Sequence, residues 1–286
     1  MDVLAITIEG GGIAVRLGPP GGAPGLHVSG LAGWYGTPDG KWDLTERQLG
    51  DGAFAIEPSR VAYSSRTVTV DGYALGRTMA EALSSLAPLG AMAHRLVSIA
   101  VDDGVAETYA TGALTAEVGK GVRGGAVTFT LTVVCPDPRR YSTQTQTAYM
   151  NPAASSDSGL VYSGSGVLTL PLAYSGETAA GAGTATIANG GTATAYPVIT
   201  LHGNIGHVSI RDVAGTGTLA YRGSASASAP VVLDCLSRTA TVNGVDVTRN
   251  LVQRTWPSIP AGGSITLSVT GQGDGYIEVV SHDTYI

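Results

Sequence analysis

Hydrophobic and polar positions alternate most regularly between Ala126 and Cys135, where the sequence reads AVTFTLTVVC. A two-residue period is typical of a β-strand that buries one face, and here the other face carries threonines. The apolar positions are Val127, Phe129, Leu131 and Val133. Pro136 and Pro138 follow, and because proline has no backbone N–H, the ladder of hydrogen bonds must stop there. The pattern predicts the last strand of one domain, a basic turn at Arg139-Arg140-Tyr141, and a junction to a second domain.

The same period predicts further strands in the first half of the chain. We expect them over Val3–Ile8, Ile13–Leu17, Thr67–Tyr73, Arg95–Val101 and Ala106–Leu114. Gly10–Gly12 separates the first two strands, and Asp102-Asp103-Gly104 is a hairpin turn between the last two. Between Trp34 and Phe54, aromatic residues stand among glycines and aspartates, so we expect a long loop of the kind that is often functional or interfacial.

One helix is predicted, over Thr78–Ala87. Thr78 can cap its N-terminus, and Glu81 stands at the capping-box position three residues later. The apolar residues at helical spacing are Met79, Ala82, Leu83 and Leu86. Pro88 and Gly90 are expected to end the helix. We therefore expect a β-structure with a single helix packed on it.

Strands recur at short intervals in the second half, as in an all-β sandwich. We expect them over Val198–Leu201, Val208–Asp212, Leu219–Tyr221, Val231–Cys235, Thr239–Asn243, Ser264–Thr270 and Tyr276–Ser281. Asn243-Gly244 is the strongest hairpin-turn signal in the chain. The stretch from Ser142 to Ala195 has few charges and resembles a linker, but alternation in Ser163–Leu172 and Ala182–Ile187 favours edge strands with long loops.

Length and composition agree with this pattern. The 286 residues suffice for two domains, which we place at residues 1–145 and 146–286. The 41 glycines, 14 prolines and 13% charged residues are typical of short strands with glycine-rich turns rather than of a disordered chain. The net charge of −6 disfavours nucleic acid as a specific partner, because phosphate binding needs a basic surface.

The sequence predicts neither membrane insertion nor export. Its apolar runs are shorter than the roughly 18 residues of a membrane span, and the start, MDVLAITIEG, lacks the basic region of a secretory signal. We therefore expect synthesis in the cytoplasm. Cys135 and Cys235 are expected to be buried reduced thiols, with an inter-domain disulfide as the alternative.

The polar residues form no pattern that predicts catalysis. His202 and His207 have only Asp212 nearby as a third ligand, so exposed or capping histidines are favoured over a metal site. Asp102-Asp103-Gly104 is favoured as a hairpin turn over a calcium loop. No nucleophile elbow occurs, and acidic residues in the second half are too sparse to suggest a glycosidase pair. We expect a protein that is not an enzyme and has no metal or cofactor.

Two stretches resemble the distal tail protein (Dit, or phage tail component) family of bacteriophages with long non-contractile tails. The first is the capped helix followed by VTFTLTVVCPDPRRYS, at 127–142, which is similar to the strand and "DP-R-Y" exit that close the family's N-terminal domain. The second comprises NGGTATAYPVITLHG, VVLDCLSRTATVNGVDV and WPSIPAGGSITLSVTG, which are similar to the family's galectin-like sandwich. Ile259 and Ser264 depart from the family pattern, which has Leu and Asn there.

The resemblance implies a mainly β fold, with an N-terminal β-barrel or sandwich ring domain that carries one helix and a C-terminal galectin-like β-sandwich. It implies a structural virion protein whose N-terminal domains form a homohexameric ring at the distal end of the tail. Such a ring joins the tail tube protein to the tail tip hub or fibre protein, and DNA passes through it without specific binding. The expected location is the virion tail tip, after synthesis in the bacterial host cytoplasm.

Four residues are candidates for contacts between subunits: Trp34, Trp42, Arg139 and Arg140. The tryptophans lie in the expected loop, where aromatic side chains suit either an interface or a local core. The arginines either pair with acidic residues of a neighbour or belong to a solvated turn. The alternative function is a carbohydrate-binding module for host-surface glycans, with Trp256 as its sugar platform. A core position or a subunit contact are the other interpretations of Trp256.

Overall fold

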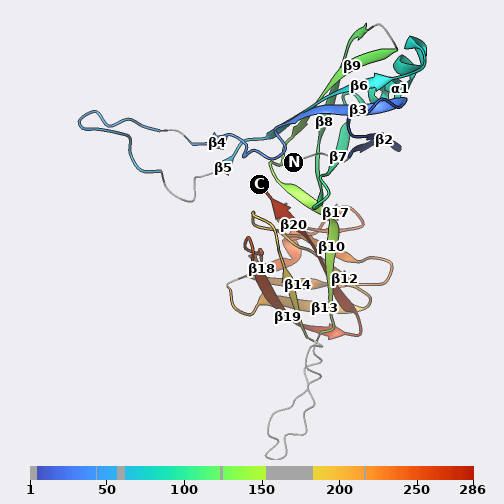
Figure 1. Ribbon diagram of the computed structural model, residues 1–286. Helices are drawn as coiled ribbons and strands as arrows, with labels where there is room; N and C mark the ends of the chain where they lie inside the picture. The colour runs from blue at the N-terminus through green and yellow to red at the C-terminus, as the bar shows by residue number, and fades with distance from the viewer. Residues whose placement is uncertain (1–4, 43, 57–61, 123–124, 153–182, 216) are drawn as a thin grey trace, which may run out of the picture. The chain divides into compact units, whose positions relative to one another are not determined.

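The computed structural model describes residues 5–42, 44–56, 62–122, 125–152, 183–215 and 217–286. The chain folds as two compact units, of which the first comprises Met1–Gln144 with Tyr285–Ile286 and the second Thr145–Thr284 (Figure 1). Strands make up most of the described residues of both units, so the expected mainly β fold is confirmed.

An antiparallel sheet forms the first unit. Its order is β3 (Gly25–Ala32), β6 (Arg66–Leu75), β9 (Ala126–Cys135), β8 (Glu107–Val122), β7 (Leu96–Asp102), β1 (Ala5–Gly10) and β2 (Ile13–Leu17). The long strand β8 pairs with β7 over residues 107–113 and with β9 over residues 113–122. The two edges of the sheet touch at a parallel bridge between Gly18 and His27. Among the described strands no continuous ladder closes a barrel, so the sheet is curled and open.

The apolar face that the alternation predicts in β9 is the buried face of this sheet. Val127, Phe129, Leu131 and Val133 are each at most 2% exposed. In the neighbouring strand β6, Val68 and Val70 are fully buried. The other face carries hydroxyl groups, and there the Thr130 hydroxyl donates a hydrogen bond to Asp71 at 2.8 Å. The sheet therefore has one apolar and one hydroxyl-rich face.

Helix α1 (Met79–Met92) packs on this sheet and begins where the sequence predicts. The Thr78 side chain accepts a hydrogen bond from the Glu81 N–H at 3.2 Å, which confirms the N-cap. The Glu81 carboxylate accepts from the N–H of Arg77 at 2.7 Å, one residue before the cap. Among the described residues, no helix combines the length and the apolar character needed to cross a membrane.

The predicted end of the helix at Ala87 is wrong, because α1 continues through Pro88 to Met92. Pro88 lacks an N–H for the helical ladder, and an interior proline costs about 3 kcal/mol. The additional turn buries Leu89 and Met92, which are 2% and 0% exposed. Burial of each such side chain stabilises by about 1.5–3 kcal/mol, which offsets the cost of the proline.

The predicted apolar face of the helix is half right. Ala82 and Leu86 are buried, whereas Met79 and Leu83 are 36% and 48% exposed. The buried positions of α1 are Ala82, Leu86, Leu89 and Met92. Because the helix extends past the proline, its buried stripe follows the later apolar residues and leaves the first ones at the surface.

Two sheets form the second unit. One has the order β17 (Val245–Asp246), β16 (Thr239–Val242), β15 (Val231–Asp234), β12 (Val198–His202), β20 (Tyr276–Tyr285) and β10 (Arg140–Met150). The other has the order β11 (Thr184–Ala188), β19 (Ser264–Gly273), β13 (Ile205–Asp212), β14 (Thr218–Ala225) and β18 (Leu251–Thr255). A short 3-10 helix, Thr248–Asn250, precedes β18. Buried residues of both sheets, such as Leu201 and Val269, belong to one hydrophobic core, so this unit is a β-sandwich.

The expected hairpin at Asn243-Gly244 is confirmed. Val242 pairs with Val245, and the two turn residues have φ values of 48° and 80°, as a type I′ turn requires. Among the strands longer than two residues, three were not expected from the pattern: β3, β10 and β18. Ser163–Leu172, an expected edge strand, lies outside the described residues, whereas the strand expected over Ala182–Ile187 corresponds to β11.

The cysteines are buried free thiols, as expected. Burial raises the pKa of the Cys135 thiol to about 11, and burial also raises the pKa of Cys235. Since the thiolate is the reactive form, both side chains are unreactive at neutral pH and serve as small apolar core residues.

Replacing Leu131 with alanine tests the role of the buried face of β9. Leu131 is fully buried, so Leu131→Ala is expected to lower the free energy of unfolding by about 2–5 kcal/mol through lost burial and a cavity. Urea denaturation followed by circular dichroism measures this change. Val134→Ala is the control in the same strand, because Val134 is 42% exposed. Equal losses for both variants would contradict the assignment of the faces.

Candidate assembly interface

A long loop leaves the sheet of the first unit between β3 and β6. Its base is a short ribbon in which β4 (Gly40–Lys41) pairs with β5 (Ala62–Tyr63). Its outer part turns back on itself, and there the Phe54 N–H donates to the Thr45 carbonyl at 2.9 Å. Figure 1 shows this loop, in blue, projecting from the sheet. We call the described residues between 33 and 63 the arm; the expected loop in this region is confirmed.

Glycine is required where the arm begins. Gly33 has a φ of +76°, and a Cβ atom there would lie 2.0 Å from the carbonyl oxygen of Thr67. Only a residue without a side chain allows this approach of the arm to β6. The first turn of the arm is therefore fixed by backbone packing.

Arg66, the first residue of β6, holds the base of the arm. It is 1% exposed, and its Nη1 donates to the carbonyl oxygens of Gly33, Trp34 and Gly36 at 2.7–2.9 Å. Its Nε donates to the carbonyl of Pro138 at 2.7 Å, in the turn after β9. Burial and the neighbouring Arg140 lower the pKa of Arg66, but a guanidinium in a protein stays protonated. One buried cation thus joins the arm to the basic turn that the sequence singled out.

Arg140, at the start of β10, lies among aromatic rings. Its Cζ atom is 5.7 Å from the ring centroid of Trp34, 5.6 Å from that of Tyr35 and 5.9 Å from that of Tyr285. Cation–π contacts at such distances contribute about 0.5–2 kcal/mol each, depending on how far they are desolvated. Burial lowers the pKa of Arg140, whereas the nearby Tyr35 and Asp103 raise it. The rings, together with a hydrogen bond from Nη2 to the backbone oxygen of Ile286 at 3.5 Å, therefore stabilise this charge.

The turn between β9 and β10 is braced by Asp137. Its carboxylate accepts hydrogen bonds from the backbone N–H and the guanidinium of Arg139, at 3.1 and 3.2 Å, and from the Tyr141 hydroxyl at 2.5 Å. Burial and the bond to Asp137 raise the pKa of Tyr141, so its hydroxyl remains a donor. The sequence PDPRRY therefore specifies a rigid corner, in which prolines restrict the backbone and side chains close the turn.

Asp103, in the hairpin between β7 and β8, contacts the base of the arm. Its Oδ1 accepts from the N–H groups of Val105 and Ala106, each at 3.0 Å, and its Oδ2 accepts from the Tyr35 hydroxyl at 3.1 Å. Burial alone would raise the pKa of Asp103, but the hydrogen bonds from Ala106, Val105 and Tyr35 outweigh it and lower the pKa. The expected hairpin turn is confirmed, and its carboxylate also positions the arm.

The four predicted interface residues divide into two pairs. Trp34 and Arg140 are 1% and 9% exposed, so both belong to the interior of their own unit, as the local-core interpretation of Trp34 states. Trp42 is 45% exposed on the arm, and the Arg139 side chain is 26% exposed. A role for Trp42 and Arg139 in subunit contacts stays a prediction.

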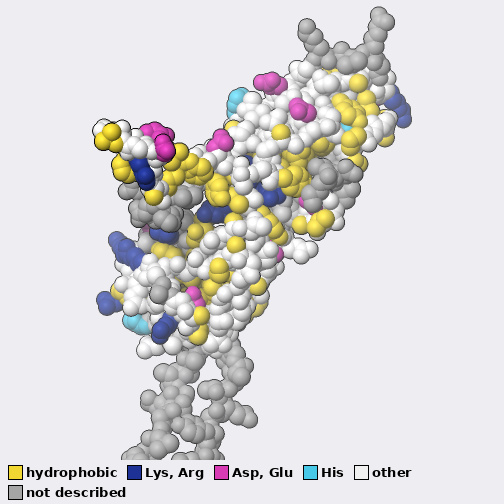
Figure 2. Space-filling view, turned by 60° about the vertical axis from the view of Figure 1, so that its left-hand side comes forward, with side chains coloured by type: hydrophobic (Ala, Val, Ile, Leu, Met, Phe, Trp, Pro, Cys, Tyr) yellow, Lys and Arg dark blue, Asp and Glu magenta, His cyan; other side chains and the backbone are white. Residues whose placement is uncertain are grey.

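The arm exposes more apolar surface than Trp42 alone. Its exposed large apolar residues are Tyr35, Trp42, Leu44, Leu49, Phe54 and Tyr63, between 40% and 93% exposed. Figure 2 shows hydrophobic side chains (yellow) beside charged ones on this projecting segment. Contiguous exposed apolar groups mark interaction surfaces more often than isolated ones do. No sequence signal other than aromatic residues in a loop pointed to this surface.

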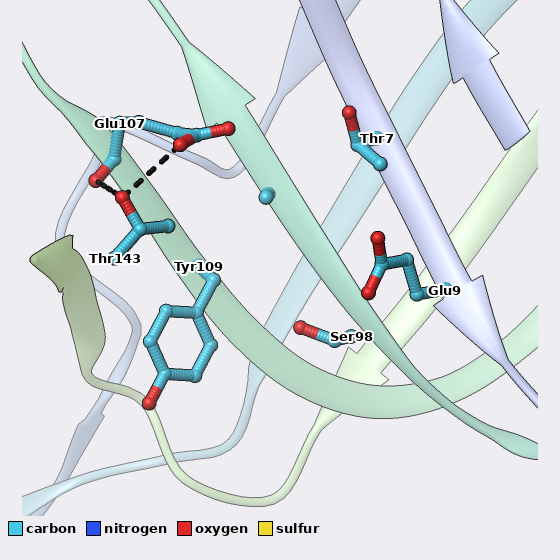
Figure 3. A pocket seen from close by; sticks show the side chains of 7 residues that line it. Thr7, Glu9, Ser98, Glu107, Tyr109 and Thr143 are labelled. Carbon is cyan, nitrogen blue, oxygen red and sulfur yellow. Dashed lines mark hydrogen bonds between the residues drawn. The ribbon is translucent and has the colours of Figure 1, made fainter. Parts of the chain in front are cut away.

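A separate pocket of about 430 Å³ lies on the hydroxyl-rich face of the first unit (Figure 3). Its polar lining residues are Thr7, Glu9, Ser98, Glu107, Tyr109 and Thr143. The Thr143 hydroxyl donates to the Glu107 carboxylate at 3.1 Å, on one side of the pocket, and Glu9 lies apart from this pair. The lining can accept hydrogen bonds from a cationic or hydroxyl-bearing group. No pattern in the sequence predicts this pocket.

The remaining residues considered for sugar or metal binding lie in the second unit. Trp256 is partly buried and packs against the hydrophobic core, which is the core interpretation of this residue. His202 bonds to Glu278 at 3.0 Å, and His207 has a positive φ of 50° at an irregular point of β13. Across the described part of the chain, no three His, Cys, Asp or Glu side chains gather as metal ligands would.

Comparison with known proteins bears on the fold. No family model matches the sequence, and no curated protein matches it. Among solved structures, the chain is similar to SPP1 Dit (gp 19.1), described as a paradigm of the hub adsorption apparatus in phages that infect Gram-positive bacteria. The TM-score is 0.62 at 14% identity, and the match covers 98% of this chain and 99% of that chain. The chain therefore has a Dit-like fold in both units, which confirms the fold that the sequence resemblance implied.

Weaker similarity extends to two structures of the phage P2 baseplate in its activated conformation, one with Ca and one with Sr. Each has a TM-score of 0.49 at 9% identity and covers 96% of this chain and 97% of that chain.

Substitution of Arg66 tests its role at the base of the arm. Arg66→Lys keeps the charge but cannot reproduce the planar fork that reaches four carbonyls, so we expect a loss of about 2–4 kcal/mol in the free energy of unfolding. Urea denaturation measures it. Arg139→Lys is the control, since this partly exposed ion pair with Asp137 is expected to contribute less than about 1 kcal/mol. A loss no larger than the control's would show that Arg66 does not hold the arm.

The Asp103 carboxylate predicts a pH dependence. Because its pKa is lower in the folded chain than in the unfolded one, its charge stabilises the fold above pH ~4, and this contribution is lost as the pH falls through the folded value. Asp103→Asn removes the charge and keeps the shape. We expect it to be less stable than the parent at pH 7 and to approach the parent near pH 3. Thermal denaturation at both pH values measures this, with Asp51→Asn on the arm as control. A stability difference independent of pH would contradict the role of the charge.

Proposed function

We propose that the chain is a structural subunit of a bacteriophage tail and forms a hexameric ring at its distal end. The supporting observation is the fold shared with SPP1 Dit, which covers 98% of this chain and 99% of that one. Since the match covers nearly all of both chains, the structural similarity includes both units. A hub at the end of a tail is the function that this architecture supports best.

In this proposal the ring connects the tail tube protein to the tip hub or fibre protein of the virion, and the chain catalyses no reaction. A closed ring forms when one surface of a subunit binds a different surface of the next and the rotation closes. The arm supplies one such surface, with Trp42 and Leu49 as exposed apolar contacts. Arg139, in the turn after β9, is a further candidate contact for acidic groups of a neighbour. The net charge of −6 suits a conduit through which DNA passes without binding.

The solution mass of the purified chain tests the ring. Light scattering over a range of concentrations is expected to give six times the chain mass of 28.9 kDa. Trp42→Asp with Leu49→Asp places charges on the arm, which should prevent its burial in a neighbour and shift the mass toward the monomer. Val245→Asp is the control, since Val245 is 65% exposed in a turn of the second unit. A parent that stays monomeric at every concentration would contradict ring formation by this chain alone.

A further inference from the structure

The sequence contains two Asn-Gly pairs, Asn189-Gly190 and Asn243-Gly244, and both lie in the second unit. An asparagine that precedes a glycine loses its side-chain amide in water when the next backbone nitrogen attacks the side-chain carbonyl carbon, because glycine has no side chain to obstruct this approach. The reaction needs a side chain that is free to turn toward that nitrogen. The two pairs differ in whether the structure allows this movement.

The Asn189 side chain is held at both ends of its amide. It is 1% exposed, and its Nδ2 donates to the carbonyl oxygens of Ala193 at 2.7 Å and Pro260 at 3.2 Å. Its Oδ1 accepts from the N–H groups of Gly191 at 3.0 Å and Thr284 at 3.1 Å. The amide therefore turns only when these hydrogen bonds break.

The attacking nitrogen of the same pair is restrained as well. The Gly190 N–H donates to the Asp283 carboxylate at 2.7 Å, a charge-assisted hydrogen bond that keeps the proton on the nitrogen. A Cβ atom built at Gly190 would lie 3.3 Å from this carboxylate, so this side of the backbone is covered. The structure thus restrains both groups that would have to react at Asn189-Gly190.

Asn243-Gly244 is the exposed turn between β16 and β17, and its groups are not restrained in this way. Among the described contacts of the chain, the Asn243 side chain makes no hydrogen bond. The space beside Gly244 is open, since a Cβ atom built there would meet no atom within 4 Å. Both reacting groups are therefore accessible to water.

The turn lies at the edge of a sheet, where local opening is least costly. Among the described strands β17 pairs only with β16, through two residue pairs. Ala240 fixes the chain beyond them, because its carbonyl accepts from the Val247 N–H at 2.8 Å and its N–H donates to the Thr248 hydroxyl at 2.9 Å. The Asn243 side chain can therefore swing toward the Gly244 nitrogen by opening this turn alone, while the core stays folded.

We propose that Asn243 is a site of spontaneous deamidation, at which the folded chain forms aspartate and isoaspartate through a succinimide. The Gly244 nitrogen loses its proton to solvent base and bonds to Cγ of Asn243, and the Cγ–Nδ2 bond breaks. The leaving nitrogen takes up a proton from water and departs as ammonia. Water then adds to either carbonyl carbon of the ring and opens it, so the net reaction consumes one water and releases one ammonia.

The products change the edge of this sheet. Isoaspartate adds a methylene group to the backbone of the turn, which a two-residue type I′ turn does not accommodate. Both products also place a new carboxylate near Asp246, so like charges meet at the edge. We expect the pairing of β17 with β16 to weaken while the inner strands of the sheet persist. The reaction depends on this turn and not on the proposed ring.

Peptide mapping by mass spectrometry tests the site on the full-length protein, incubated in a weakly alkaline buffer. We expect the mass increase of an amide-to-carboxylate conversion to be at least about tenfold faster at Asn243 than at Asn189, whose hydrogen bonds must break first. Labelling with protein isoaspartate methyltransferase identifies the isoaspartyl product. Asn243→Gly is the matched variant, because glycine keeps the positive φ of the turn and should abolish the label.

The chain denatured in urea is the reference, because structure protects neither pair there and both peptides are expected to react at similar rates. An Asn243 peptide that stays unmodified in the folded protein, over a period in which it reacts in urea, would overturn the proposal. Equal rates at Asn243 and Asn189 in the folded protein would also overturn it. So would isoaspartate labelling that persists in the Asn243→Gly variant.

Discussion

The buried guanidinium of Arg66 is the contact on which the irregular parts of the first unit depend. A buried charge is costly unless its donors are hydrogen-bonded, so the carbonyls that it bonds must keep their positions. These carbonyls belong to the start of the arm and to the turn after β9, two segments outside the regular ladder. Arg66 therefore determines both where the arm leaves the sheet and where β10 begins. The aromatic rings around Arg140 stabilise a second cation at the same corner.

Regular alternation was sufficient to predict the strands that bury one face. β2, β7 and β9 lie where the pattern placed them, because a two-residue period has few other structural solutions. Arg66 was missed, although it stands in phase with Val68 and Val70, which is the buried phase of β6. An arginine at a buried position of the alternating pattern was thus the feature of the sequence that could have identified this contact. The helix end was missed because burial of Leu89 and Met92 outweighs the local effect of Pro88.

The candidate sites were less predictable than the strands, because exposure depends on contacts distant in sequence. Trp34 and Trp42 occupy the same kind of loop sequence, yet Trp34 packs beside Arg140 and Trp42 projects on the arm. The Asn-Gly pairs of the second unit are a stronger example, since one is exposed and the other is restrained by Asp283, which bonds to Gly190 from 93 positions away. The fold of the whole unit brings Asp283 to this place, and no local motif encodes it. The resemblance to the distal tail protein family, which covers both halves of the sequence, nevertheless predicted the fold of both units.

The chain passes between its two units twice. It leaves the first unit after Gln144 and returns to it with Tyr285–Ile286, where the Tyr285 ring packs on Arg140. In topology, the second unit is therefore an insertion within the first. During synthesis the first unit lacks this ring until residues 145–284 have left the ribosome, so its corner at Arg140 is completed last. The same connectivity makes the sandwich replaceable: a different module between the same two connection points would leave the sheet of the first unit and its arm intact.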